Sequence, residues 1–475
     1  MKQTMSKNTI TTITTKWNEL DDKAVDTARV LAMDSVQKVG NGHPGTAMSL
    51  APIAYTLFQR ILRHDPANPN WFGRDRFILS CGHSSLTLYI QLFFSGYGIE
   101  LNDLQSFRTW GAKTPGHPEY GHTVGVETTT GPLGQGVANG VGMAMAARFV
   151  RGLLTDKNDL ENSELFSPNI WVLCSDGDLQ EGISAEASSL AGTQKLGNLK
   201  VIYDDNRISI EGDTHLAFTE DVSARYKAYG WEVFEVEMKK DGNVDREKFE
   251  TAALSALKIN DRPVLIRLKS VIAWPAPSAK GTAKSHGSAL GADEVAKTKA
   301  ILGFDETKSF YVDEKVLAHA REVKTRAETL YKEWDKKFQS WRHANPEKGK
   351  LFDRIKNLDI PTNLELPKFE DKDKKLIQYL AQHEHTSPFR HAYVQFHVKA
   401  PIFVFRQWMK HQVGCSWNEI SGRYVEFPDD EFFIPTSFRQ QSKDNKQGSE
   451  GEIEVNHRES ARLAYETACK HAVAE

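Results

Sequence analysis

The sequence predicts an α/β fold with a doubly wound, mostly parallel sheet, followed by a smaller α+β segment. Two short apolar runs, residues 170–174 and 199–203, are predicted to be strands, and residues 181–196 between them carry Ala, Ser and Leu at helical spacing. A strand, helix, strand unit of this length closes as a right-handed crossover between parallel strands. We therefore expect both strands to end at the same carboxyl edge of one sheet, where such folds bind ligands.

The rest of the amino-terminal part alternates helices with glycine-rich loops. Apolar residues recur at helical spacing from Asp21 to Leu62, with a break at the loop from Gly40 to Gly45. Residues 77–80 are predicted to be a strand that runs into the next helix. A helix of small residues is expected from 136 to 150, and another strand at 264–268.

Composition narrows the classes of partner. The 475 residues, 40% of them hydrophobic, suffice for two or more domains with their own cores. A net charge of −3 gives no broad basic surface, so nucleic acid is not an expected partner. The four cysteines show no Cys-x-x-Cys spacing, which suits a reducing compartment, and we expect a cytoplasmic protein. No apolar segment is long enough for a signal peptide or a membrane span, so no membrane is expected.

Polar residues follow the two central strands where each is expected to end. Asp176-Gly177 follows the first strand and Asp204-Asp205-Asn206 follows the second. Mg²⁺ prefers oxygen ligands and leaves several positions to water and phosphate, so the Asp176 carboxylate, the Asn206 amide oxygen and the Ile208 carbonyl suit a magnesium ion that bridges to a diphosphate. The alternative is that Asp-Gly is an ordinary turn and Asp-Asp-Asn a helix cap.

Four histidines lie on loops framed by glycine or proline. They are His43, His83, His117 and His286. Each one alone is more often structural or solvated than catalytic. Four histidines on such loops are harder to explain by structural roles alone.

These motifs resemble a known family. The run Ser175-Asp176-Gly177-Asp178, followed by Asp-Asp-Asn, resembles the thiamine diphosphate fingerprint, with Ser175 in place of its usual first glycine. Residues 180–187 and 203–212 are similar to transketolase in particular, as is the run from Val126 to Gly136.

The resemblance to transketolase implies roles for single residues. It places thiamine diphosphate and Mg²⁺ in this domain and sugar phosphates as substrates. The implied catalytic residues are His43, His117 and His286, of which His43 and His286 also bind substrate. The implied cofactor-binding residues are His83, Gly131, Pro132, Leu133, Gly177, Asp178, Glu181, Asn206 and His286. The implied metal ligands are Asp176, Asn206 and Ile208.

The resemblance to transketolase covers only part of the chain. We assign residues 1–303 to a diphosphate-binding domain and 304–370, rich in charged amphipathic helices, to a helical linker. In the family a second domain binds the aminopyrimidine and supplies a glutamate that activates the cofactor. Residues 371–475 follow a different pattern, so the resemblance implies a homo-oligomer or a partner chain that supplies the pyrimidine-binding domain.

Residues 371–475 resemble a second family. His385-Thr-Ser-Pro-Phe389, residues 396–404 and Asn418-Glu-Ile-Ser-Gly-Arg-Tyr424 are similar to flavin-dependent thymidylate synthases. This resemblance implies FAD contacts at Ser387 and Asn418. It implies dUMP contacts at Gln407, Glu419, Ser421, Gly422 and Arg423. A metal site among the five histidines between His383 and His411 is disfavoured, since their spacing is irregular.

Three functions stay open at this point. The first is transketolase-type transfer of a two-carbon ketol unit between sugar phosphates, incomplete without a pyrimidine-binding domain. The second is a flavin-dependent thymidylate synthase subunit that methylates dUMP. The third is a non-catalytic fusion of two ligand-binding fragments.

Overall fold

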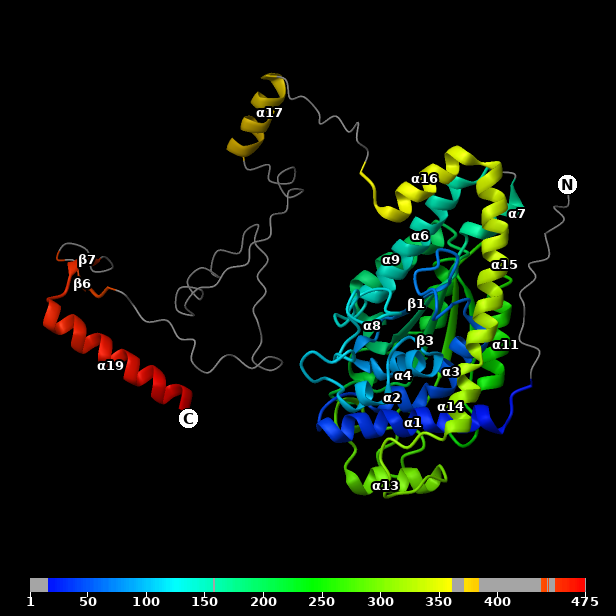
Figure 1. Ribbon diagram of the computed structural model, residues 1–475, viewed down its shortest axis with the longest axis horizontal. Coiled ribbons are helices and arrows are strands. Elements are labelled where there is room, and N and C mark those ends of the chain that lie inside the picture. Colours follow the sequence, from blue (N-terminus) through cyan, green and yellow to red (C-terminus); the bar gives the residue numbers. More distant parts are fainter. Residues whose placement is uncertain are drawn as a thin grey trace. The chain divides into compact units, whose positions relative to one another are not determined.

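The computed structural model describes residues 16–156, 159–360, 371–383, 437–441, 443 and 449–474. These residues fall into two compact units, one that ends at Ile360 and one that begins at Pro361. The first unit is a parallel sheet between two layers of helices (Figure 1), which confirms the predicted α/β class.

The sheet of the first unit has five strands in the order β1-β2-β3-β5-β4, and every neighbouring pair is parallel. The strands are β1 (Arg76–Leu79), β2 (Ile170–Ser175), β3 (Leu199–Asp205), β4 (Glu232–Val236) and β5 (Val264–Lys269). Ser175 pairs with Asp204 in the register of β2 and β3. The two central strands therefore end side by side, as the crossover argument predicted.

Each face of the sheet carries its own hydrophobic core. In β2, Ile170, Val172 and Cys174 point to one face, where they pack with α6 and α9. Trp171 and Leu173 alternate to the other face, which α1, α3, α4 and α11 cover. All of these β2 side chains are at most 1% exposed, which explains why the strand is apolar throughout.

The helices of the first unit connect and cover the strands. The α-helices before β2 are α1 (Glu19–Val39), α2 (Gly45–Ser49), α3 (Ala51–Thr56), α4 (Leu86–Ser95), α5 (Leu101–Gln105), α6 (Gln135–Leu154) and α7 (Leu160–Ser163). Those from β2 to Ile301 are α8 (Asp176–Gln180), α9 (Gly182–Thr193), α10 (Val222–Ala228), α11 (Arg246–Ala256), α12 (Lys284–Gly287) and α13 (Ala292–Ile301). The short helical turns are η1 (Leu57–Ile61), η2 (Gly82–Ser84), η3 (Glu164–Phe166) and η4 (Thr214–Leu216). None of the helices in the described ranges is both long and apolar enough to cross a membrane.

The segment predicted as a helical linker packs on the first unit. It contains α14 (Glu314–Arg321), α15 (Val323–Ala344) and α16 (Pro346–Asn357). Phe338, Trp341 and Phe352 from these helices form one core with Leu154 and Phe166. The long helix α15 runs along the side of the unit (Figure 1).

The second unit is described only in part. Its elements are α17 (Asp371–Gln382), the antiparallel pair β6 (Arg439–Gln441) and β7 (Ser449–Glu452), and α19 (Val455–Ala474). The FAD and dUMP contacts expected at residues 387, 407, 418, 419 and 421–423 lie outside the described residues.

Candidate functional site

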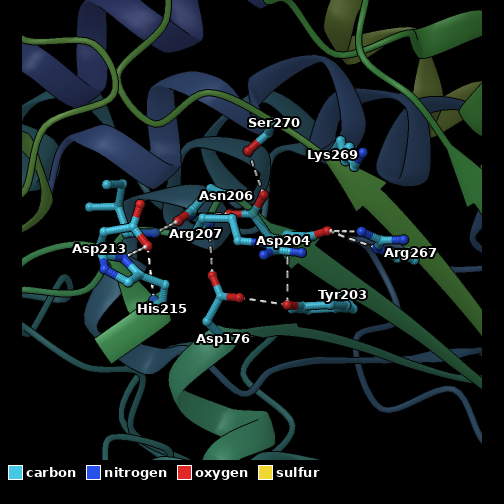
Figure 2. A network of polar contacts seen from close by, with 12 residues as sticks. Asp176, Tyr203, Asp204, Asn206, Arg207, Asp213, His215, Arg267, Lys269 and Ser270 are labelled. Atoms are coloured by element: carbon cyan, nitrogen blue, oxygen red, sulfur yellow. Dashed lines mark hydrogen bonds and ion pairs between the residues drawn. The ribbon is translucent and has the colours of Figure 1, made fainter. Parts of the chain in front are cut away.

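Asp176 lies at the carboxyl end of β2 and is 2% exposed. Its Oδ1 accepts a hydrogen bond from the Tyr203 hydroxyl at 2.5 Å, and its Oδ2 accepts one from the Arg207 backbone N–H at 3.1 Å (Figure 2). Burial, reinforced by the charge of Asp205, raises the pKa of Asp176 to about 6, against the effect of these hydrogen bonds. A bound cation would stabilise a carboxylate that is buried in this way.

Asp176-Gly177 starts a helix, so the alternative of an ordinary turn at this position was wrong. Helix α8 begins at Asp176, and Ser175 caps it. The Asp178 carboxylate accepts from the Ser175 N–H at 2.9 Å, which completes a capping box. Because the backbone enters the helix directly, the unpaired N–H groups of its first turn lie at the end of β2.

The loop after β3 contacts Asp176 through its backbone. Asn206 directly precedes the Arg207 N–H that binds Asp176. The Asn206 amide is oriented on both sides, because Nδ2 donates to Asp204 at 2.7 Å and Oδ1 accepts from the Ile208 N–H at 2.9 Å. Ile208 forms an antiparallel β-bridge with Asp213, which closes the loop. The three predicted metal ligands are thus held in one loop and one helix start.

Asp178 ties three segments of the site together. Its carboxylate is fully buried and accepts from the Ser80 hydroxyl at 2.6 Å and from the Gly134 N–H at 2.8 Å, in addition to the Ser175 groups. The loop before α6 is therefore fixed to the end of β2. By accepting the hydrogen bond from the Gly134 N–H, Asp178 holds the preceding loop of Gly131, Pro132 and Leu133 in position.

Close backbone approaches shape the loops around this edge. A Cβ at Gly177 would lie 2.8 Å from Leu133 Cδ1, and one at Gly82 would lie 2.6 Å from Thr130 Oγ1. Gly131 has a φ of 155° and passes next to the His117 ring. Pro132 and Glu181 are both exposed, and Glu181 caps α9 beside Gly134. These contacts bring the predicted diphosphate-binding loops together.

Three of the four predicted histidines form a cluster. The ring centroids of His43 and His83 lie 5.0 Å apart, those of His83 and His286 5.0 Å, and those of His43 and His286 5.6 Å. His117 contributes to the electrostatic environment of His43 and His83. One buried ring nitrogen on each of His43, His83 and His286 has no hydrogen-bond partner in the described part of the chain.

The environment keeps these imidazoles neutral. Burial, followed by His286, Arg108 and His117, lowers the pKa of His43 to about 3. Burial also lowers the pKa of His83, His117 and His286, although a hydrogen bond to the Ile208 backbone opposes the shift at His286. Neutral rings with unpaired nitrogens can accept or donate hydrogen bonds to a hydroxylated ligand.

The oxygens of Asp176, Asn206 and Ile208 could bind a metal ion only if water or phosphate oxygens complete its coordination. Within the described ranges, no group of three or more His, Cys, Asp or Glu side chains is placed to hold a metal ion. One carboxylate, one amide oxygen and one backbone carbonyl leave positions that water and phosphate oxygens fill in magnesium sites.

Three residues of this network were not predicted from the sequence. They are Tyr203, Arg207 and Ser80, which bind Asp176 or Asp178. Tyr203 counts as apolar in a strand pattern, and Arg207 acts through its backbone. Ser80 lies at the end of β1, and its position at a strand end in the same sheet was the one available signal.

The parallel sheet and the polar groups gathered at its carboxyl edge define a doubly wound α/β domain of the class that binds phosphorylated ligands. The chain belongs to the transketolase family. Residues 20–361 match the family model described as transketolase, thiamine diphosphate binding domain.

Curated relatives and solved structures agree with this family. The transketolase of Mycobacterium tuberculosis is 55% identical over 362 residues, which are 76% of this chain and 51% of the relative. The transketolase of Geobacillus stearothermophilus is 44% identical over 356 residues, 74% of this chain and 52% of the relative. The chain thus spans about half the length of the curated relatives it matches.

Two solved structures illustrate the similarity of fold. A transketolase variant of Pichia stipitis in complex with xylulose 5-phosphate superposes with a TM-score of 0.69 at 39% identity, over 73% of this chain and 50% of that chain. Transketolase of Leishmania mexicana gives a TM-score of 0.69 at 36% identity, over 74% of this chain and 51% of that chain.

Residues 315–475 match a second family model, described as thymidylate synthase complementing protein. This match supports the second resemblance and begins inside the predicted linker. The two matches overlap at residues 315–361, which contain α15, α16 and all of α14 except its first residue. These helices pack on the first unit, where His319 binds Asp21 at 2.9 Å and Trp334 donates to the Leu165 carbonyl at 3.0 Å.

Proposed function

We propose that the first unit is the diphosphate-binding half of a transketolase-type enzyme, which transfers a two-carbon ketol unit between sugar phosphates. The observation that carries this proposal is the meeting of Asp176 and the loop of Asn206 at one sheet edge of a domain with 55% identity to a transketolase. The proposal places sugar phosphates next to the histidine cluster and the protein in the cytoplasm.

Asp176, Asn206 and the Ile208 carbonyl would hold Mg²⁺, and the metal would neutralise the diphosphate of the cofactor. Three features support the fit. The pKa of the buried Asp176 carboxylate is raised by burial and by the charge of Asp205, the Asn206 amide is pre-oriented by Asp204, and Gly177 lacks a Cβ, which would lie 2.8 Å from Leu133 Cδ1. Gly131, Pro132, Leu133, Asp178 and Glu181 form or brace the surrounding loops.

Thiamine diphosphate, when bound, supplies the nucleophilic carbon of the transfer reaction. The residues of this chain bind and orient. Neutral His43, His117 and His286 would accept protons from, or hydrogen-bond to, the hydroxyls of the sugar, and His83 and His286 would also contact the cofactor. Their lowered pKa values keep the rings neutral around pH 7, so that their nitrogens can accept hydrogen bonds from the substrate.

The aminopyrimidine half of the site would come from a partner chain that carries the pyrimidine-binding domain, because a second copy of these 475 residues would not add one. A candidate contact face lies on α6 and α9. Phe149 is 68% exposed and Leu153 41% exposed on α6, and Ile183 and Leu190 are exposed on the neighbouring α9. An apolar face of this kind on two packed helices is typical of a protein interface.

Ketol transfer can be tested by complementation. The chain is mixed with the carboxyl-terminal part of Mycobacterium tuberculosis transketolase, and transfer from xylulose 5-phosphate is measured with thiamine diphosphate and Mg²⁺. We expect turnover in the mixture and none from the chain alone. The Asp176→Ala variant should be inactive both alone and in the mixture. A mixture that stays inactive although it binds the cofactor would contradict the proposed transfer.

A second candidate function rests on the match of residues 315–475 to the thymidylate synthase complementing family. In this proposal FAD binds through Ser387 and Asn418. dUMP binds through Gln407, Glu419, Ser421, Gly422 and Arg423, with Arg423 on the phosphate. Visible flavin absorbance retained after gel filtration with FAD would support it, and its loss in Asn418→Ala would locate the site. A colourless protein would contradict it and favour a non-catalytic fusion.

A further inference from the structure

We propose that the first unit carries a second binding site, which takes a small organic anion with an apolar body. The site is a cavity of about 740 Å³ between residues 69–76, residues 120–127 and one side of α6. It shares none of its lining residues with the candidate active site, so it is a separate site. Its volume lies in the range of about 300–1,000 Å³ that is common for small-molecule pockets.

Charged side chains line one part of the cavity. Arg74 donates from Nε and Nη2 to both oxygens of Glu127, at 3.1 and 2.9 Å. Arg76 Nε lies 3.6 Å from the same carboxylate, and its Nη2 donates to the Phe72 carbonyl at 3.2 Å. Backbone and carboxylate contacts thus fix both guanidinium groups in place before any ligand binds, which lowers the entropic cost of binding.

The cations outnumber the anions at this position. Arg74 and Arg76 share the single carboxylate of Glu127, while the adjacent Asp75 is already paired with Arg63 at 2.9 Å. The side chains of Arg74 and Arg76 are each only 16% exposed, so water screens their charge weakly. An anionic group of a ligand would balance this excess positive charge.

The remaining walls are apolar. Phe72 and Phe166 lie with ring centroids 6.3 Å apart, and Met143, Ala146 and Val150 project from α6. A ligand that places a carboxylate, sulfonate or phosphate at the arginines would bury its hydrocarbon part against these side chains. Burial of apolar area stabilises such a complex by about 25 cal/mol per Å² before association costs.

Fluorescence of two matched probes tests this site in the full chain. 1-Anilinonaphthalene-8-sulfonate has an apolar body with one anionic group, and N-phenyl-1-naphthylamine has the same body without it. We expect one equivalent of the sulfonate to bind at least about tenfold more tightly than the neutral probe. Equal affinities would overturn the recognition of an anion.

Two variants of α6 locate the bound probe. Ala146→Glu adds a carboxylate to the cavity wall at an exposed helical position, where it should not impair folding. It should weaken binding of the sulfonate about tenfold or more. Leu153→Glu makes a similar change on the same helix outside the cavity and should leave this affinity within about twofold. The reverse pattern would place the probe on the exposed face of α6 and refute the site.

Discussion

At the scale of single residues, buried titratable groups set how the protein responds to pH. His64 is buried, and its Nε2 lies 2.7 Å from the Phe58 carbonyl oxygen while its Nδ1 lies 2.9 Å from the Tyr97 hydroxyl. A neutral ring satisfies both contacts, with Nε2 as donor and Nδ1 as acceptor. Burial, with Arg326 nearby, lowers the pKa of His64 to about 3.

This geometry predicts acid destabilisation through His64. Its folded pKa of about 3 lies below the ordinary value of 6.5, so the unfolded chain binds the proton more tightly. The contribution of His64 to the free energy of unfolding is fully present above pH 6.5. It falls by up to about 1.4 kcal/mol per pH unit as the pH drops toward 3. Urea unfolding of the wild type and His64→Gln from pH 7 to 5 should show a shallower pH dependence in the variant.

The exposed His343 provides the control for His64. His343→Gln should keep the wild-type slope of unfolding free energy against pH, because its side chain lies at the surface. The histidines of the candidate site also have lowered pKa values and add to the wild-type slope, so the difference between variants is the informative quantity. Identical slopes for His64→Gln and the wild type would contradict the assignment.

Only some residues of the candidate site could be predicted from the sequence. The sequence pointed to Asp176, Asn206 and the four histidines because each stands at a loop or strand end with a recognisable motif. It could not reveal the Tyr203 hydroxyl on Asp176 or the unpaired ring nitrogens, since both depend on contacts between distant segments. The roles of the predicted site residues in binding and catalysis stay predictions.

At the scale of elements, α6 shows how close packing onto the sheet requires glycine. A Cβ on Gly140 would lie 2.4 Å from Val172 Cγ2 on the central strand β2, which is fully buried. A Cβ on Gly142, two residues further along the same helix, would meet nothing within 4 Å.

The two glycines give a matched pair of substitutions. Gly140→Ala should destabilise the first unit by about 1–3 kcal/mol, because overpacking moves β2 or the helix. Gly142→Ala should stabilise it by up to about 1 kcal/mol through helix propensity alone. Thermal or urea unfolding of both variants measures the difference. Equal effects would show that α6 does not pack on the sheet through Gly140.

The strands were predictable to different degrees. Buried strands such as β2 and β3 are continuous apolar runs, and the sequence located them within a residue or two. The edge strand β4, Glu-Val-Phe-Glu-Val, was not predicted, because four of its five residues are partly or fully exposed and two are acidic, so it is not a continuous apolar run. The helix start at Asp176 was not predicted, because the helix was expected over residues 181–196, although Ser175 and Asp178 have the spacing of a capping box.

At the scale of the whole molecule, the extent of the first unit is the main structural result. Helices α14 to α16 lie beyond the predicted domain end at residue 303. They contribute Phe338, Trp341 and Phe352 to a core with Leu154 and Phe166. Arg326 also donates to the Leu62 and Phe58 carbonyls at 3.0 Å each.

Two truncated chains test the extent of this unit. A chain that ends at Ile360 should unfold in urea with a midpoint close to that of the first unit in the full protein. A chain that ends at Gly303 loses the aromatic core and should be destabilised by several kcal/mol or fail to fold, since large buried side chains contribute about 3–5 kcal/mol each. Equal stability of both chains would show that α14 to α16 are only a linker.

The central claim is that Asp176 at the sheet edge holds the metal of a diphosphate cofactor. Isothermal titration of thiamine diphosphate into the full chain, with and without Mg²⁺, tests it most directly. We expect magnesium-dependent binding in the wild type and in Glu211→Ala, an exposed acidic control on the neighbouring loop. Asp176→Ala should bind at least about 100-fold more weakly. Equal heats from Asp176→Ala and the wild type would contradict the claim.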